Sequence, residues 1–188
     1  MNGVVTADAQ TWHLTGESPG PAGYLTVTTR TYVLPNGRES DWDILVGGRT
    51  VAVLALTPDG RVLLVRQYRP GPDALLLELP GGMVESGEEV LHAAARELTE
   101  ETGYVAQELT LVGQTWLASY ATHQRFAVLA TGCRPLGEQH MDPDEFCEVV
   151  QVSMNDFLEH ARGGQLTDTD IAFMCLDHLA RTSGGRVT

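Results

Sequence analysis

The sequence predicts an α+β domain with a β-hairpin placed before it. Two observations predict this class: short β-branched runs recur along the chain, and helical periodicity is confined to three segments lying among and after them. A third observation bounds the size, because 188 residues are enough for one core with a small added unit. We see no internal repeat.

The segment ahead of the main domain is expected to be a hairpin. The run YLTVTTRTYVL at 24–34 alternates and is β-branched, a turn is expected at 35–38, and SDWDILV at 40–46 returns. A lone two-stranded sheet is marginal in water. The hairpin must therefore pack on the rest of the chain or on a second subunit. Residues 1–23 look irregular apart from a short strand around Trp12.

The main domain is expected to follow Gly47 and Gly48. Its strands are predicted at 50–56, 61–68, 75–79, 107–118, 124–131 and 147–152. Ser153 is a typical N-cap for a helix to about Arg162, and a last helix opens at Thr167 or Asp168 and runs to about Arg181. The predicted organisation is an extension at 1–48, a domain at 49–182 and a loose tail at 183–188.

The stretch GGMVESGEEVLHAAARELTEETGY at 81–104 contains the remaining helix. Ser86 or Gly87 is predicted to start it, and Gly103 to end it in the left-handed conformation. Glu88 and Glu89 would then be favourable in the first turn. A core-facing stripe is expected from the apolar residues that recur at helical spacing, which are Leu91, Ala94, Ala95 and Leu98.

Three acidic residues of this helix indicate a metal site. Glu97, Glu100 and Glu101 stand at i, i+3 and i+4, so their side chains emerge on one face. They repel one another unless a cation lies between them, and carboxylate oxygens favour Mg²⁺ or Mn²⁺ over softer metals. Arg96 could hold one carboxylate in a bidentate pair.

The alternative interpretation is a solvated acidic helix face, and the surrounding residues disfavour it. Gly82, Glu88, Arg96 and Gly103 all stand in register with the three carboxylates. Gly81 and Gly82 would let the backbone come close to a metal or a phosphate.

Charge, hydropathy and cysteine usage exclude several classes of function. The net charge of −13 argues against nucleic acid as the main ligand, and all twelve basic residues are arginine. No apolar run approaches the ~20 residues that span a bilayer, and the first residues lack the pattern of a secretory signal. Cys133, Cys147 and Cys175 have no CxxC spacing, which favours buried, reduced thiols in a cytoplasmic protein.

The spacing from Gly82 through Glu88, Arg96, Glu97, Leu98, Glu100 and Glu101 to Gly103 resembles the Nudix box, the signature of the Nudix hydrolase family. One position departs: Tyr104 stands where the family usually has an aliphatic residue, at a packing site. The resemblance implies the Nudix fold, a mixed sheet sandwiched between helices, over about 49–182.

Further similarity covers about 24–180 and is to the ADP-ribose pyrophosphatase subfamily. It rests on Gln67, Tyr68 and Arg69, on LELPGGMVESGE, and on the C-terminal stretch from DEFCEVVQV onward. The resemblance implies Mg²⁺ held by Glu97, Glu101 and the Gly81 carbonyl, with Glu100 near the ions. It also implies that Arg69 meets a substrate phosphate or ribose, and that the protein is a homodimer built through its N-terminal strands.

One departure concerns the substrate. Many ADP-ribose hydrolases have a proline about sixteen residues past the box glycine, and here Tyr120 stands in its place, between Ser119 and Ala121. GDP-mannose, another nucleoside diphosphate sugar or a nucleotide therefore stays possible. Tyr120 is expected either to contact the distal part of the substrate or to pack within its loop.

The expected reaction is hydrolysis of a diphosphate bridge to two monophosphates, in which metal polarises a water and a carboxylate takes its proton. Glu145 is our candidate base. Other acidic residues nearby are Glu138, Asp142, Asp144 and Glu148, and for each a plain surface role is an alternative.

The sequence disfavours two alternative functions. A non-catalytic ADP-ribose-binding sensor would commonly carry a DNA-binding extension or a degraded box, and this chain has neither. A hydrolase of damaged nucleoside triphosphates is disfavoured by the N-terminal hairpin and the two C-terminal helices.

Overall fold

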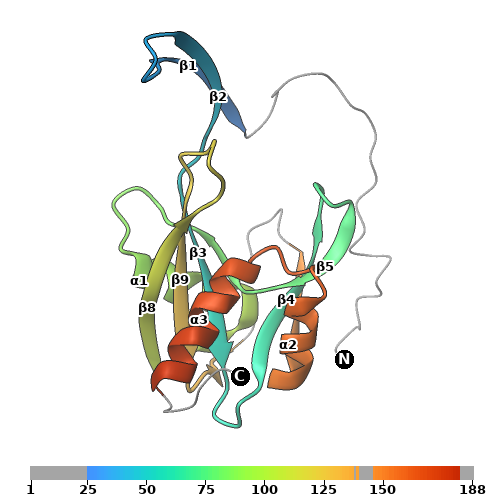
Figure 1. The fold of residues 1–188 in the computed structure, drawn as a ribbon. Helices are drawn as coiled ribbons and strands as arrows, with labels where there is room; N and C mark the ends of the chain where they lie inside the picture. The colour runs from blue at the N-terminus through green and yellow to red at the C-terminus, as the bar shows by residue number, and fades with distance from the viewer. Residues whose placement is uncertain (1–24, 138, 140–145, 183–188) are drawn as a thin grey trace.

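The computed structural model describes residues 25–137, 139 and 146–182. They form a layered body from which a hairpin projects (Figure 1). The short strand expected near Trp12 and the tail at 183–188 lie outside the described residues.

The body is built on a seven-stranded mixed sheet. Its main path runs β11–β4–β3–β9–β8, while β5 pairs with β4 and β6 pairs with β3. The central β3–β9 pair is parallel, and the other pairs are antiparallel. The strands are β3 (Arg49–Leu56), β4 (Val62–Arg69), β5 (Ala74–Glu78), β6 (Gly81–Met83), β8 (Glu108–Trp116), β9 (Gln124–Thr131) and β11 (Cys147–Val152).

Helices cover both faces of this sheet, as the predicted sandwich requires (Figure 1). Alternation along β3 sends Val51 and Val53 into a cluster with α1 (Val90–Thr102). Ala52 and Leu54 point the other way, into a cluster that includes Phe157 of α2 (Met154–Arg162) and residues of α3 (Thr169–Thr182). The α1 layer carries the acidic residues, and the α3 layer lies across the sheet from it.

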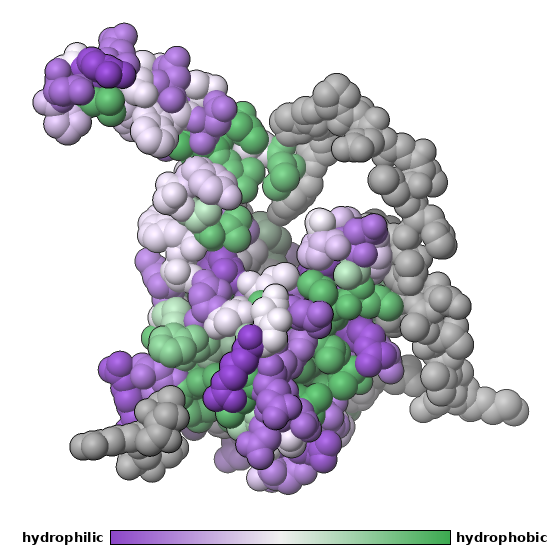
Figure 2. Space-filling view, turned by 45° about the vertical axis from the view of Figure 1, so that its right-hand side comes forward, coloured by the Kyte–Doolittle hydropathy of each residue, from purple (hydrophilic) through white to green (hydrophobic). Residues whose placement is uncertain are grey.

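The N-terminal hairpin forms as predicted and makes its own two-stranded sheet. β1 (Thr26–Val33) pairs antiparallel with β2 (Glu39–Val46). It meets the body at its base, where the Leu45 N–H donates to the Tyr120 carbonyl (2.9 Å) and the Leu45 carbonyl accepts from the Thr122 N–H (3.0 Å). Figure 2 shows it as an arm, hydrophilic at the tip and hydrophobic where it approaches the body. Trp42 stays 54% exposed, so much of the apolar surface of the arm is uncovered.

Two details of α1 correct the prediction. The helix begins at Val90, after Glu89, and not at Ser86 or Gly87; no acidic residue lies in its first turn. Its buried stripe is Val90, Ala93, Ala94 and Leu98, whereas Leu91 is 36% exposed. The predicted ends of two helices are confirmed: Gly103 is left-handed (φ 70°), and the Ser153 side chain accepts from the Asp156 N–H (3.2 Å). The short strands β6, β7 (Tyr104–Val105) and β10 (Arg134–Pro135) were not predicted.

The cysteines behave as expected. All three are free and buried. Burial raises the pKa of Cys133 to about 11 and that of Cys175 to about 12. Among the described helices, none is long and apolar enough to cross a membrane.

Candidate active site

Two glycines bring the start of β6 against the acidic face of α1. The Gly81 N–H donates to Oε2 of Glu101 (2.7 Å). A Cβ at Gly82 would lie 2.5 Å from Oε1 of Glu97, and a Cβ at Gly81 would lie 2.1 Å from the Val51 carbonyl oxygen. A side chain at Gly81 would collide with backbone, whereas one at Gly82 would displace the Glu97 carboxylate.

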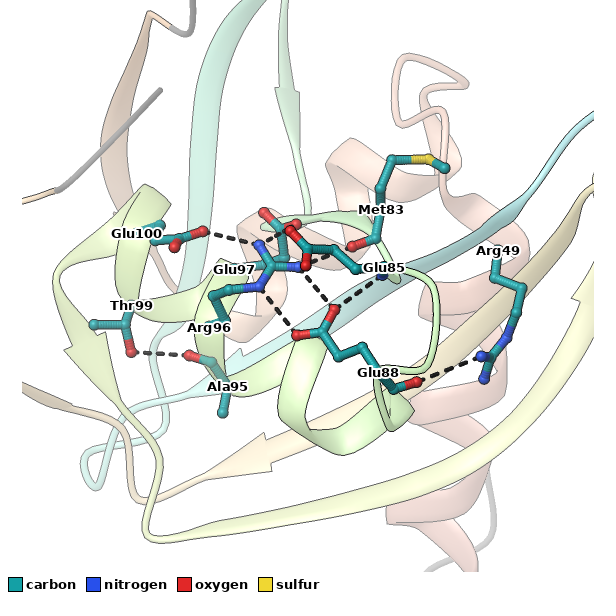
Figure 3. Close-up of polar contacts among 9 residues, drawn as sticks. All are labelled: Arg49, Met83, Glu85, Glu88, Ala95, Arg96, Glu97, Thr99 and Glu100. Carbon is teal, nitrogen blue, oxygen red and sulfur yellow. Dashed lines mark hydrogen bonds and ion pairs between the residues drawn. The ribbon is translucent and has the colours of Figure 1, made fainter. Parts of the chain in front are cut away.

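Arg96 is the centre of the polar network on α1 (Figure 3). Its Nε and Nη2 donate to the two carboxylate oxygens of Glu88, both at 3.1 Å. Its Nη1 donates to Glu97 (2.9 Å) and to Glu100 (3.0 Å). Nη2 also donates to the Met83 carbonyl (2.9 Å). The expected single bidentate pair is therefore made with Glu88, and Arg96 links two further carboxylates to it.

These contacts shift the pKa values of both partners. Bonding to Glu88 raises the pKa of Arg96, against the effect of burial. The Arg96 guanidinium, with the Glu85 N–H, lowers the pKa of Glu88 from its ordinary 4.5. Because the pKa of Glu88 is lower in the folded state than in the unfolded chain, the ionised form of Glu88 stabilises the fold.

We expect that in Glu88→Gln the free energy of unfolding falls less steeply than in wild type as the pH is lowered. The contribution of Glu88 is fully present above its ordinary pKa of 4.5 and is lost as pH falls through its lower folded-state pKa. The variant should therefore be less stable than wild type at neutral pH and approach it under acid conditions. Urea unfolding in EDTA across this pH range measures the difference. A constant difference at every pH would contradict the assignment.

A cavity of about 200 Å³ lies across β6 from this network. Its walls come from β3, β4, β6, β9 and the start of α3, and they are Thr50, Val51, Ala52, Arg69, Leu79, Gly81, Gly82, Met83, Arg125, Thr167, Asp168 and Ile171. The glycines are shared by the cavity and by the carboxylates of α1. A molecule in the cavity would thus lie beside the proposed metal ligands.

Two arginines, each paired with acidic residues, form the polar side of the cavity. Arg69 pairs with Glu78, whose side chain is fully buried, and Thr167 donates to the same carboxylate. Arg125 pairs with Asp168 and with Asp170. Burial raises the pKa of Asp168 although Arg125 opposes this.

The oxygen donors beside the glycines suit a hard cation. Glu97 is 7% exposed and Glu101 is 5% exposed, and their carboxylates flank Gly82 and Gly81. Carboxylate and carbonyl oxygens are the ligand class of Mg²⁺. Within the described residues, no three Asp, Glu, His or Cys side chains already converge as a metal-binding group. Glu97 and Glu100 both contact Arg96 instead, so ion binding there would compete with the guanidinium.

The other candidates lie in different places. Tyr120 is 59% exposed on the loop between β8 and β9 and does not line the cavity. Glu148, on β11, pairs with Arg66 (3.3 Å), and both side chains are about half-buried. The candidate base Glu145, with Glu138, Asp142 and Asp144, lies outside the described residues.

Sequence reasoning missed four polar residues of this region: Glu78, Arg125, Thr167 and Asp168. One signal was present, because Glu78 is an acid inside the apolar run LLLEL. For Thr167 and Asp168 the sequence predicts only that one of them opens the last helix.

Comparisons with known proteins place the chain in a family. Residues 46–169 match the NUDIX domain. The chain is 36% identical over 142 residues to an ADP-ribose pyrophosphatase of Bacillus subtilis, covering 74% of this chain and 77% of the relative. It is 32% identical over 143 residues to a methanol dehydrogenase activator of Bacillus methanolicus, covering 72% and 75%. A crystal structure of an ADP compounds hydrolase superposes with a TM-score of 0.73 at 24% identity, covering 91% of this chain and 94% of that one.

The fold and the box together define the class: the chain belongs to the Nudix family and is a hydrolase. Within the family it is an ADP-ribose pyrophosphatase-like member.

Proposed function

We propose that this protein hydrolyses the diphosphate bond of a nucleoside diphosphate sugar, with ADP-ribose as substrate, AMP and ribose 5-phosphate as products, and Mg²⁺ as cofactor. The observation that carries the proposal is the joint position of Gly81 and Gly82, which touch the Glu101 and Glu97 carboxylates and line the neighbouring cavity. The relatives named as ADP-ribose pyrophosphatases support the substrate class.

Glu97, Glu101 and the Gly81 carbonyl would hold Mg²⁺, or Mn²⁺, with Glu100 nearby. A bound dication would neutralise phosphate charge and make a water more acidic. Arg96 would orient Glu97 and Glu100 through its ion pairs with both carboxylates. Arg69, on the cavity wall, would bind substrate phosphate.

Proton transfer needs a base besides these groups. Glu145 is our candidate, and Glu138, Asp142, Asp144 and Glu148 are its alternatives. Of these Glu148 is the one within the described residues, and its contact with Arg66 makes it the weaker choice. Tyr120 is proposed to contact the distal part of the substrate from the loop that receives the hairpin.

The arm is proposed to serve assembly. Residues 1–48 would form an N-terminal extension on a domain at 49–182, and the exposed Trp42 and Val27 of the arm would pack in a homodimer. Buried, free cysteines are consistent with a reducing cytoplasm. Whether strands are exchanged between subunits would be decided by a structure of the assembly.

The test is a panel of substrates with product identification. Purified protein with Mg²⁺ is expected to release AMP and ribose 5-phosphate from ADP-ribose faster than it acts on GDP-mannose or nucleoside triphosphates. Preferred cleavage of GDP-mannose would move the assignment to another sugar nucleotide. Tight ADP-ribose binding by calorimetry without turnover would replace the enzyme by a sensor.

A further inference from the structure

The two arginines of the cavity differ in the donors they leave free. Arg125 uses both terminal nitrogens: Nη1 donates to both oxygens of Asp170 (2.9 Å each), and Nη2 donates to Asp168. Arg69 donates from Nε to Glu78. Its Nη1 and Nη2 make no hydrogen bond or ion pair with the described residues. Of the two cavity arginines, Arg69 is therefore the one whose two terminal nitrogens, Nη1 and Nη2, can donate together to a ligand; we call this pair of nitrogens the Arg69 fork. Arg125 instead links β9 to the start of α3.

Glu78 is the residue that holds this fork. Its side chain is fully buried, and a buried carboxylate requires compensating donors. Each of its oxygens has one: Oε2 accepts from Arg69 Nε, and Oε1 accepts from the Thr167 hydroxyl. The carboxylate on β5 is thereby fixed from β4 and from the segment before α3.

We propose that Glu78 is a positioning residue that, with Thr167, fixes the Arg69 guanidinium so that its two terminal nitrogens face the substrate diphosphate in the cavity. The inference rests on the proposed function, because Arg69 is taken as a phosphate ligand. A guanidinium is planar, and a contact at Nε fixes its orientation, so that the Nη1–Nη2 edge is held where it can donate to two phosphate oxygens.

Charge shows how this fork acts. Arg69 and Glu78 cancel formally, as do Arg125 and Asp168, so the cavity wall has no excess positive charge. The fork therefore recognises phosphate through directed hydrogen bonds and not through net attraction. Removing the Glu78 charge should weaken binding even though the wall becomes more positive.

The test is Glu78→Gln, which keeps the shape and one acceptor oxygen but removes the charge. KM for ADP-ribose is expected to rise about tenfold with kcat nearly unchanged, the size of one misdirected charged hydrogen bond. A double-mutant cycle with Arg69→Gln separates positioning from stability. In the Arg69→Gln background, Glu78→Gln should cause no further rise in KM. Equal, additive effects in both backgrounds would overturn the proposal.

Two more variants provide a second test and a control. Thr167→Val keeps the buried charge and the Arg69 pair but removes the second anchor, and a rise of about threefold in KM is expected from losing one neutral hydrogen bond. Thr167→Val replaces Glu78→Gln as the test if Glu78→Gln does not fold. Asp177→Asn is the control, because it removes an acid partner from Arg181 on α3 without touching Arg69 or any residue of the cavity wall, and KM should not change. A lower melting temperature in Glu78→Gln or Thr167→Val with KM unchanged would mean that the network is only structural.

Failure of the proposed function can be distinguished from failure of the positioning role. If wild type cleaves no compound of the panel, the ADP affinity measured by calorimetry still tests whether Glu78 positions the Arg69 guanidinium. Wild type should then bind ADP about tenfold more tightly than Glu78→Gln, and Glu78→Gln about as weakly as Arg69→Gln. Equal ADP affinity for all three would overturn the positioning role independently of turnover.

Discussion

Glu101→Gln is expected to lower kcat/KM by on the order of 10³-fold, because it removes the charge of a proposed metal ligand. The fold should survive. The Gln side chain keeps an oxygen that can accept the Gly81 N–H, which Glu101 accepts at 2.7 Å in the wild type. Rates measured over a Mg²⁺ titration should show the apparent metal affinity falling together with the maximal rate.

The matched control for Glu101 is Glu89→Gln. Glu89 is also in the box and lies directly before α1, but it is exposed and makes no side-chain cap bond. The same chemical change there should leave the rate within about twofold, as for most surface substitutions. If Glu101→Gln lost no more activity than Glu89→Gln, the metal ligands would have to be sought elsewhere.

Gly82→Ala is expected to lower kcat/KM by about 100-fold, the size associated with misplacing a catalytic group by an ångström. The added Cβ would lie 2.5 Å from Glu97 Oε1, 2.6 Å from Cδ and 2.7 Å from Oε2. The carboxylate must therefore move away from the glycine backbone. Because the end of a side chain can shift more easily than backbone can, activity should suffer more than stability.

Gly71→Ala provides the comparison for Gly82→Ala. A Cβ at Gly71 meets nothing within 4 Å, and Gly71 does not require a left-handed conformation. Steady-state rates and melting temperatures of both variants separate the effect of crowding from the general cost of replacing a glycine. An active Gly82→Ala enzyme with wild-type metal dependence would show that Glu97 can serve from another position.

The box could be predicted because its chemistry is local in sequence. Helical spacing alone places Glu97, Glu100 and Glu101 on one side of a helix, and Gly103 is a strong stop signal. The start of the helix was predicted too early for a physical reason. Glu88 does not enter the first turn, since its carboxylate accepts from the Glu85 N–H and from Arg96.

The cavity could not be predicted because its parts are distant in sequence. Thr167 reaches Glu78 across 89 positions, and Arg125 reaches Asp168 across 43. None of these four residues belongs to a motif with a recognisable spacing, so a single sequence gives no reason to pair Thr167 with Glu78 or Arg125 with Asp168. The role of Tyr120 is equally undecided by local pattern, because its loop is defined by contact with the arm.

The parallel pairing of β3 with β9 bears on how the molecule is made. Arg49 lies opposite Gln124 in the middle of the sheet, so the centre closes only when segments far apart on the chain have met. Such non-local closure is slow relative to the formation of helices and hairpins. During synthesis, a nascent chain that stops before residue 124 would lack a central strand and leave one side of β3 open. The stretch at 81–104, which carries the proposed metal ligands, should therefore not fold by itself: excised with its flanking strands, it is expected to remain unfolded and to bind metal no better than a short acidic peptide.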